Sequence, residues 1–292
     1  MNLDNEQIDM LKDDPEFKEY YETMERKNGT TEAIPSMKFL RRNVEVTQIM
    51  LGDELLSLPN RIWLFSDKNV VYICDQCLLQ YWDSVSFDNH RKDCSSGAPG
   101  KYVYIDEKEG ISILEIDGKN ESVLCRRICT IGKGFIRRKT LYLDVDGYLF
   151  YVLFCGGKLG GFFSKEKEST EHNLSCLLVL PPYRSKGYGS LMIDLSYILG
   201  TGTPEKPLSK EGRTVYKKYW RNKVLNTLKK ATEQEMSIKD ISAESGLSID
   251  DTIHGLELLG ISPESHIYDV TDKVSVLSKE CKKDCLVLQV KI

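Results

Sequence analysis

Four potential metal ligands lie close together in the sequence. Two residues separate Cys74 from Cys77, twelve separate Cys77 from His90, and three separate His90 from Cys94. A tight turn can present the first pair and one helical turn the second, so the four side chains can surround Zn²⁺ tetrahedrally. A chance grouping is the alternative, but His90 is one of only four histidines and it falls at the required position. Four protein ligands leave no coordination position for water, which predicts a structural zinc ion.

A basic, glycine-containing loop, residues 184–189, is the second candidate site. It follows an apolar run over residues 174–180 that has the length and composition of a fully buried strand, and it precedes an expected helix over residues 190–199. Glycine lets the backbone approach a ligand, and the N-terminus of a helix attracts anions. Arg184 and Lys186 add positive charge, so the loop suits a pyrophosphate. Taken alone, an ordinary strand-to-helix turn explains the pattern equally well.

Strand-like runs dominate the middle of the chain and helical patterns dominate its end. The candidate strands cover residues 102–105, 111–116, 122–125, 141–145, 148–154 and 159–163. Apolar stripes beyond Trp220 indicate helices. One short helix begins at Ser237, Gly246 marks a turn, and Ser248 with Asp251 caps the next helix. We therefore expect a helix-turn-helix arrangement, whose acidic second helix is unsuited to reading DNA.

The composition excludes several classes of protein. The chain of 292 residues carries 40 basic and 44 acidic side chains, a net charge of −4, which argues against binding nucleic acid by bulk electrostatics. No run approaches the roughly 18 apolar residues of a membrane span, and the first thirty residues are too polar for a signal peptide, so we expect no membrane association. Nine cysteines, of which three belong to the metal cluster, predict reduced thiols and a metal site and not a disulfide framework.

The order of these motifs resembles the MYST histone acetyltransferases. The R-x-x-G-x-G loop after a strand is similar to the acetyl-CoA signature of GNAT-like acetyltransferases, and the C-x2-C-x12-H-x3-C finger is also found in the MYST family. The flanking sequences that carry the resemblance are residues 139–146, 163–169, 173–176, 180–183 and 204–209. The resemblance extends from about Val44 to Trp220.

The resemblance implies an α+β fold with a GNAT-like central acetyltransferase core, an N-terminal C2HC zinc-finger subdomain and a C-terminal helix-turn-helix (winged-helix-like) subdomain. The expected divisions are an acidic extension over residues 1–43, the finger over 44–100, the acetyl-CoA-binding catalytic core over 101–220 and the helix-turn-helix-like subdomain over 221–292. We expect a compact form of the family without a chromodomain.

The resemblance also implies the reaction, transfer of acetyl from acetyl-CoA to the ε-amine of histone-tail lysines. A free lysine titrates near ~10.4 and must lose a proton before it attacks, so a carboxylate general base is the simplest solution. By resemblance that base is Glu205, and Cys176 lies beside the acetyl group. An acetyl-cysteine intermediate is one route and direct attack by lysine is the other. We favour direct attack, because Cys176 has no neighbouring histidine or cation in sequence to ionise it.

Cofactor contacts are assigned by the same resemblance. Three residues are expected to bind the pantetheine arm through their backbone: Leu177, Leu178 and Val179. Seven consecutive residues are expected to surround the pyrophosphate: Arg184, Ser185, Lys186, Gly187, Tyr188, Gly189 and Ser190. Ser209 and Lys218 are expected near the cofactor, although Lys218 stands where a small polar residue is common. Lys139 matches the lysine that family members acetylate on themselves.

Two departures from the family pattern lie at this site. Ser185 stands where a basic residue is frequent, and residues 199–203 form a shorter approach to Glu205 than usual. The expected partners are histone tails or nucleosomes and further subunits of an acetyltransferase complex, with a nuclear location and no strong direct binding to DNA. The alternative is a catalytically decayed zinc-finger and helix-turn-helix scaffold subunit of a chromatin complex. The presence of Cys176, Glu205 and both loop glycines favours the enzyme.

Overall fold

The computed structural model describes residues 43–65, 70–94, 97–136, 144–200, 202–230, 236–262 and 280–287. By contacts between residues, the chain divides into residues 1–44 with 63–67 and residues 45–62 with 68–292. The metal cluster, the central sheet and the helices that follow it belong to the second unit. None of the helices in the described ranges is long and apolar enough to cross a membrane. Lys139 and nearly all of the expected N-terminal extension lie outside the described residues.

A four-stranded sheet leads into the metal cluster. Its order is β2 (Glu54–Phe65), β1 (Asn43–Leu51), β3 (Val70–Ile73) and β4 (Gln80–Tyr81). Strand β1 pairs in parallel with β3, and β3 pairs antiparallel with β4. Helix α3 (Ser84–Asp93) comes next, and its start is fixed by the Asp83 carboxylate, which accepts a hydrogen bond of 2.8 Å from the Ser86 N–H.

Five antiparallel strands form the central sheet in the order β10-β8-β7-β6-β5. The bounds are β5 (Lys101–Asp106), β6 (Ile111–Asp117), β7 (Tyr148–Cys155), β8 (Lys158–Glu166) and β10 (Cys176–Val179). Strand β7 is buried continuously from Phe150 to Phe154 because both faces of the sheet are covered. Four of the predicted strands, over residues 102–105, 111–116, 148–154 and 159–163, are confirmed.

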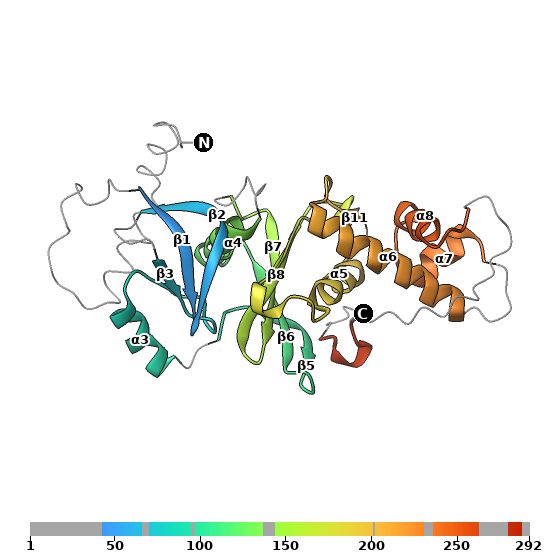
Figure 1. The fold of residues 1–292 in the computed structure, drawn as a ribbon. Coiled ribbons are helices and arrows are strands. Elements are labelled where there is room, and N and C mark those ends of the chain that lie inside the picture. The colour runs from blue at the N-terminus through green and yellow to red at the C-terminus, as the bar shows by residue number, and fades with distance from the viewer. Residues whose placement is uncertain are drawn as a thin grey trace. The chain divides into compact units, whose positions relative to one another are not determined.

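Helices cover both faces of this sheet. Tyr151 and Phe163 stack with ring centroids 4.5 Å apart on the face covered by α5 (Tyr188–Leu199) and α6 (Lys210–Lys230). Phe150 and Phe162 lie on the opposite face, because side chains alternate along a strand. Figure 1 shows α4 (Ser122–Phe135) and α5 on opposite sides of the strands.

Helix α4 corrects the prediction of a strand over residues 122–125. Its buried Leu124, Ile128 and Ile131 recur at intervals of four and three residues, which is the period of a helix. The run Val123–Leu124–Cys125 has the composition of a strand only when it is considered apart from the residues after it.

The apolar run over residues 174–180 also differs from the prediction of one fully buried strand. It is divided between β9 (His172–Leu174) and β10 at Ser175, whose N–H donates to the Ser164 carbonyl over 2.8 Å. Strand β10 is an edge strand of the sheet, so Cys176 and Leu177 are only half-buried. Strand β9 pairs in parallel with the short β11 (Thr203–Pro204).

The helix-turn-helix prediction is confirmed by α7 (Ile238–Ser245) and α8 (Ile249–Leu258). Gly246 ends α7 in the left-handed conformation that glycine adopts without strain, with φ +73°. The Ser237 and Ser248 hydroxyls cap the two helices. Helix α6 begins at Lys210, ten residues before Trp220, beyond which the apolar pattern predicts helices. The predicted domain boundary at 220–221 therefore lies inside this helix.

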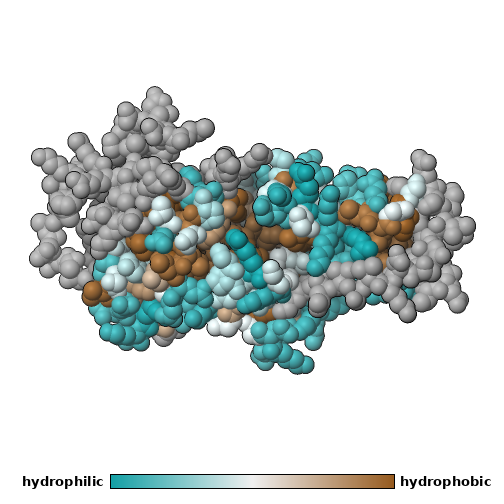
Figure 2. Space-filling model, viewed as in Figure 1, coloured by the Kyte–Doolittle hydropathy of each residue, from teal (hydrophilic) through white to brown (hydrophobic). Residues whose placement is uncertain are grey.

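A C-terminal segment, residues 280–287, returns to the central sheet. It contains the one-turn helix η3 (Lys283–Cys285), and Leu286 forms a bridge with Tyr104 on β5. The β5–β6 hairpin tip nearby, residues 107–110, is exposed, and it projects as hydrophilic surface at the lower edge of the molecule in Figure 2. All nine cysteines lie in the described ranges, and none of them forms a disulfide there.

Candidate functional site

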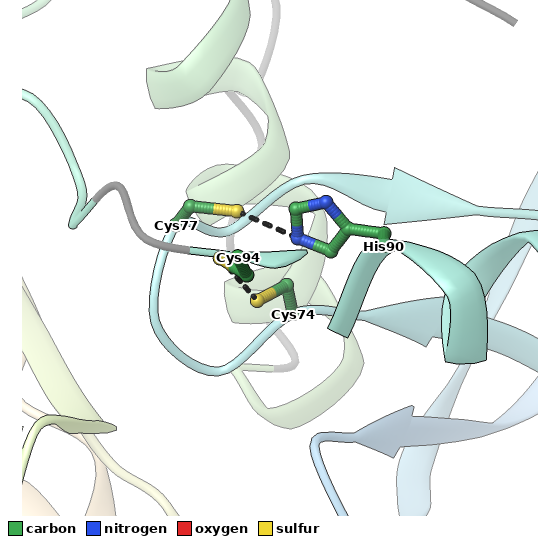
Figure 3. Close-up of side chains that lie close together, drawn as sticks. All are labelled: Cys74, Cys77, His90 and Cys94. Atoms are coloured by element: carbon green, nitrogen blue, oxygen red, sulfur yellow. Dashed lines mark hydrogen bonds between the residues drawn. The ribbon is translucent and has the colours of Figure 1, made fainter. Parts of the chain in front are cut away.

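The four predicted metal ligands converge on one point (Figure 3). Cys74 and Cys77 lie on the turn between β3 and β4, His90 lies on the last turn of α3, and Cys94 comes directly after that helix. The distance from Cys77 Sγ to His90 Nε2 is 3.2 Å, and that from Cys74 Sγ to Cys94 Sγ is 3.7 Å. Zn–S bonds of about 2.3 Å would place tetrahedral sulfur atoms about 3.8 Å apart. All four donor atoms lie within 4.8 Å of one another, so the cluster fits a tetrahedral zinc ion.

The local backbone explains how the first two ligands are presented. The Leu78 N–H donates to the Cys74 carbonyl, and the Cys74 N–H donates to the Leu79 carbonyl, both over 2.9 Å. A hydrogen bond with Cys77 lowers the pKa of the Cys74 thiol, against the opposing effect of burial. Zinc binds cysteine as the thiolate, so a lowered pKa favours metal binding. Cys74 is 1% and Cys77 7% exposed, and His90 and Cys94 are half-buried, so much of the site is shielded from solvent. The four ligands leave no coordination position for water, as a structural metal site requires.

The turn that carries these cysteines is attached to the central sheet. The Asp75 carbonyl accepts a hydrogen bond of 2.8 Å from the Leu159 N–H at the start of β8, and the Lys158 ammonium lies 3.8 Å from the Asp75 carboxylate. Strand β8 in turn pairs with β10. A zinc ion in the cluster would therefore hold one end of the strand that supports the second candidate site.

Strand β10 presents backbone groups along its outer edge. The Leu180 N–H donates to the Gly160 carbonyl on the β8 side over 2.9 Å. Because backbone groups alternate in direction along a strand, those of Leu177 and Val179 face away from β8. The Val179 carbonyl there accepts a hydrogen bond of 3.0 Å from Arg184 Nε. An extended ligand can bind such an edge as an additional strand would.

The loop after β10 ends at an uncapped helix N-terminus. Gly187 has φ +86° and precedes α5, and no side chain caps this helix. The N–H groups of Gly189 and Ser190 lie in the first turn of the helix, where no carbonyl of the preceding turn can accept them, and at the positive end of its dipole. Ser185 also adopts a left-handed conformation, with φ +61°. This arrangement is suited to a phosphate group.

Two cations stay beside this loop. The Arg184 guanidinium lies 6.0 Å from the centroid of the Phe135 ring, and the Lys186 ammonium lies 5.6 Å from that of Tyr183. Cation–π contacts of this kind hold a charge in place without neutralising it. Both side chains are exposed and can still bind an anion.

Glu205 lies beside the β9–β10 junction. Pro204 pairs with Leu174 in the parallel β11–β9 pair, and the Glu205 N–H donates to the Leu174 carbonyl over 2.9 Å. Leu174 is two residues before Cys176, so the structure brings the segments of the two predicted catalytic residues together. The Glu205 side chain is exposed, and a cis peptide bond joins Lys206 to Pro207.

Tyr148 is a residue of this region that the sequence did not indicate. It begins β7, and burial raises the pKa of its hydroxyl, with further increases from the negative charges of the Glu166 and Glu205 carboxylates. Tyr148 therefore stays protonated at neutral pH and remains a hydrogen-bond donor. Its only sequence signal is its position after Gly147 at the start of an apolar run, which predicts a strand and nothing about the site.

The remaining predicted cofactor residues lie on or before α6. The Ser209 hydroxyl accepts a hydrogen bond of 2.9 Å from the Gly212 N–H and so caps this helix. Lys218 is exposed one turn beyond Val215. A Cβ atom on Gly189 would lie 3.6 Å from the Val215 side chain, so α6 passes close to the N-terminus of α5.

Comparison with known proteins gives a consistent result. The sequence model described as the MOZ/SAS family matches residues 97–289. The histone acetyltransferase ESA1 of Yarrowia lipolytica is 36% identical, over 94% of this chain and 62% of its own length. The histone acetyltransferase mst1 of Schizosaccharomyces pombe is 35% identical, over 89% of this chain and 59% of its own length. The histone acetyltransferase MOF of Drosophila melanogaster is 39% identical over 66% of this chain and 24% of its own length. The chain thus spans about three fifths or less of these relatives.

Proposed function

This chain belongs to the MOZ/SAS family, and from that membership we propose that it transfers an acetyl group from acetyl-CoA to the ε-amine of a lysine. The membership agrees with the resemblance to MYST acetyltransferases. One observation carries the proposal. The uncapped start of α5 follows the outer edge strand β10, and the Glu205 N–H is hydrogen-bonded to Leu174, two residues before β10 begins. An acyl transfer from coenzyme A needs a site for pantetheine, a site for pyrophosphate and a base.

Strand β10 and the loop after it are suited to the pantetheine arm and the pyrophosphate. The outward backbone groups of Leu177 and Val179 would hydrogen-bond the amides of the pantetheine arm, with Leu178 buried beneath them. The pyrophosphate would bind the N–H groups at the start of α5, with Arg184 and Lys186 beside it. This placement would bring the thioester to the Cys176 end of β10.

Glu205 is the proposed general base. Its carboxylate would accept a proton from the lysine ammonium, and the neutral amine would then attack the thioester carbonyl. The new C–N bond forms, the C–S bond breaks, and the released coenzyme A thiolate takes up a proton. Tyr148, protonated and nearby, can donate a hydrogen bond within this region.

We prefer direct attack by lysine to an acetyl-cysteine intermediate. An intermediate on Cys176 would need the thiolate, and a thiol is activated by an adjacent cation or a base. In sequence Cys176 lies within the apolar run Leu174–Leu180, with no charged residue. The amine needs only the loss of a proton to a carboxylate, and Glu205 provides one.

The substrate and partners are inferred from the names of the relatives, all histone acetyltransferases. We propose histone-tail lysines, on free histones or nucleosomes, as acceptors, and a nuclear location. A net charge of −4 is compatible with a cationic tail. We also propose further subunits of an acetyltransferase complex as partners.

The experiment that tests this function is incubation with labelled acetyl-CoA and either core histones or nucleosomes, with and without co-purified subunits. Acetyl-lysine on a histone tail is the expected product. Absence of transfer under all four conditions, from folded protein, would reject the enzyme and support a scaffold role for the finger and the helix-turn-helix.

A further inference from the structure

A buried carboxylate on α8 is hydrogen-bonded to the segment that leads to Glu205. Asp251 is 2% exposed, and its two oxygens accept hydrogen bonds from two different elements. Its Oδ1 accepts from the Thr203 hydroxyl on β11 over 2.9 Å. Its Oδ2 accepts from the Tyr197 hydroxyl on α5 over 2.7 Å. The helix-turn-helix thus makes a direct polar contact with the Glu205 loop.

Helix capping does not account for this carboxylate. In α7, the Asp240 carboxylate turns back to accept a hydrogen bond of 2.9 Å from the N–H of Ser237, the capping residue, in an exposed capping box. Asp251 occupies the matching position of α8, and its N–H donates to the Ser248 hydroxyl over 3.1 Å. Its carboxylate, however, faces the interior and contacts Thr203. Both helices have a serine at the N-cap and an aspartate three residues later. In α7 the aspartate caps its own helix, whereas in α8 it contacts another element.

The carboxylate is held by a chain of buried groups. Trp220 Nε1 on α6 donates to the Tyr197 hydroxyl over 2.8 Å, and that hydroxyl donates to Asp251. Burial, followed by the charge of Asp251, raises the pKa of Tyr197, so its hydroxyl keeps the proton that it donates. Asp251 is consequently a fixed acceptor between three helices, against which Thr203 is placed.

The Thr203 segment is held on its other side by β9. The Thr203 N–H donates to the Glu171 carbonyl over 2.9 Å, and the Asn173 side chain donates to the Gly202 carbonyl over 3.3 Å. Only residues 200–202 separate α5 from β11, so the path to Glu205 is short. The Thr203 hydroxyl joins this segment to α8 through its hydrogen bond to Asp251.

We propose that Asp251 is a positioning residue for the reaction, acting through the Thr203 hydroxyl to set the place of Glu205. The proposal rests on the proposed role of Glu205 as the base. A base must lie within hydrogen-bond reach of the proton that it takes, and a small displacement lowers the rate more than it lowers substrate binding.

The test compares Thr203→Val, which removes the hydroxyl at nearly constant shape, with Thr203→Ser, which keeps it. Thr203→Val should lower kcat about tenfold with the KM for acetyl-CoA unchanged, and Thr203→Ser should restore kcat. Asp251→Asn, which loses one acceptor, should lower kcat in the same way. If Thr203→Val does not fold, the kcat of Asp251→Asn tests the role of the Asp251–Thr203 contact.

Tyr219→Phe is the matched control. It removes a tyrosine hydrogen bond of 2.7 Å to another buried carboxylate, Asp194, between α5 and α6, and leaves that carboxylate bonded to Lys223 and to the Cys281 N–H. Its melting temperature should fall at least as far as that of Thr203→Val while kcat stays at the wild-type value.

A Thr203→Val enzyme with wild-type kcat, or equal losses of kcat in Thr203→Val and Tyr219→Phe, would overturn the proposal. Glu205→Gln in the same assay distinguishes the role of Glu205 as base from the role of Asp251 in positioning it. If Glu205→Gln keeps the full rate, the role of Glu205 as base has failed. If Glu205→Gln loses activity and Thr203→Val does not, only the role of Asp251 has failed.

Discussion

Cys74 and Cys176 belong to sites of opposite construction. Cys74 is 1% exposed and lies among three further ligands whose donor atoms are all within 4.8 Å of one another. Cys176 is half-buried at the start of an edge strand, two residues after Leu174, whose carbonyl accepts the N–H of the exposed Glu205; the uncapped start of α5 follows the other end of that strand. The first site is closed by side chains alone, whereas the second is open and is formed largely by the main chain.

The two constructions suit different roles: the zinc cluster stabilises the fold, and the open region can bind a ligand. A closed set of four ligands gives a metal no position for substrate, so zinc there stabilises the fold. An open edge and an uncapped helix leave hydrogen-bonding groups for a ligand. Asp75 and Leu159 connect the two regions, since the cysteine turn is hydrogen-bonded to the start of β8.

The largest effect is expected at the closed site. His90→Ala should abolish zinc binding and lower the free energy of unfolding by several kcal/mol, because zinc binding and finger folding are coupled. Elemental analysis and thermal denaturation measure the two effects. Cys285→Ala, outside the cluster, is the control and should retain zinc. A His90→Ala protein with the wild-type zinc content would contradict the assignment of His90 as a zinc ligand of the closed site.

A smaller effect is expected at the two glycines of the open site. Gly187→Ala forces a left-handed alanine at φ +86° and should lower stability by about 1 kcal/mol. Gly189→Ala places a Cβ at ordinary contact distance, 3.6 Å from Val215, so its stability should not change. Its Kd for acetyl-CoA should nevertheless rise, about tenfold, if the pyrophosphate approaches this backbone closely.

Calorimetric titration with acetyl-CoA, together with melting curves, distinguishes these two glycine variants. Unchanged acetyl-CoA affinity in Gly189→Ala would contradict a close approach of the pyrophosphate to this backbone. The loop would then be an ordinary strand-to-helix turn.

The smallest effect is expected at Cys176. With direct attack by lysine, Cys176→Ala should keep kcat within about threefold of wild type, because no bond forms to its sulfur. Initial rates at saturating acetyl-CoA and peptide measure this. A loss of kcat of about 100-fold or more, in a folded variant, would instead support the acetyl-cysteine route.

The closed site was also the one that the sequence predicted more completely. The zinc ligands lie within one short segment, so their spacing alone indicated the cluster, and the four ligand atoms do converge. The strands over 148–154 and 159–163 were predicted because their apolar runs are bounded by a glycine turn. The α+β class and the family were likewise indicated before the structure.

The open site was less accessible to sequence reasoning because its geometry depends on non-local pairing. The bend at Ser175, the edge position of β10 and the β11–β9 pair that places Glu205 leave no periodic signal. Tyr148 and Asp251 enter this region from β7 and α8. The start of α6 was missed because the capping Ser209 precedes a polar first turn.

The measurement that tests the central claim most directly is the initial rate of acetyl transfer from acetyl-CoA to a histone-tail peptide by wild-type and Glu205→Gln proteins at neutral pH. The exchange removes the base but keeps its size at an exposed position, so both proteins should bind acetyl-CoA and melt alike. We predict that Glu205→Gln lowers kcat by a factor between about 10² and 10⁴. Equal rates for the two proteins would contradict the assignment of Glu205 as the base of this site.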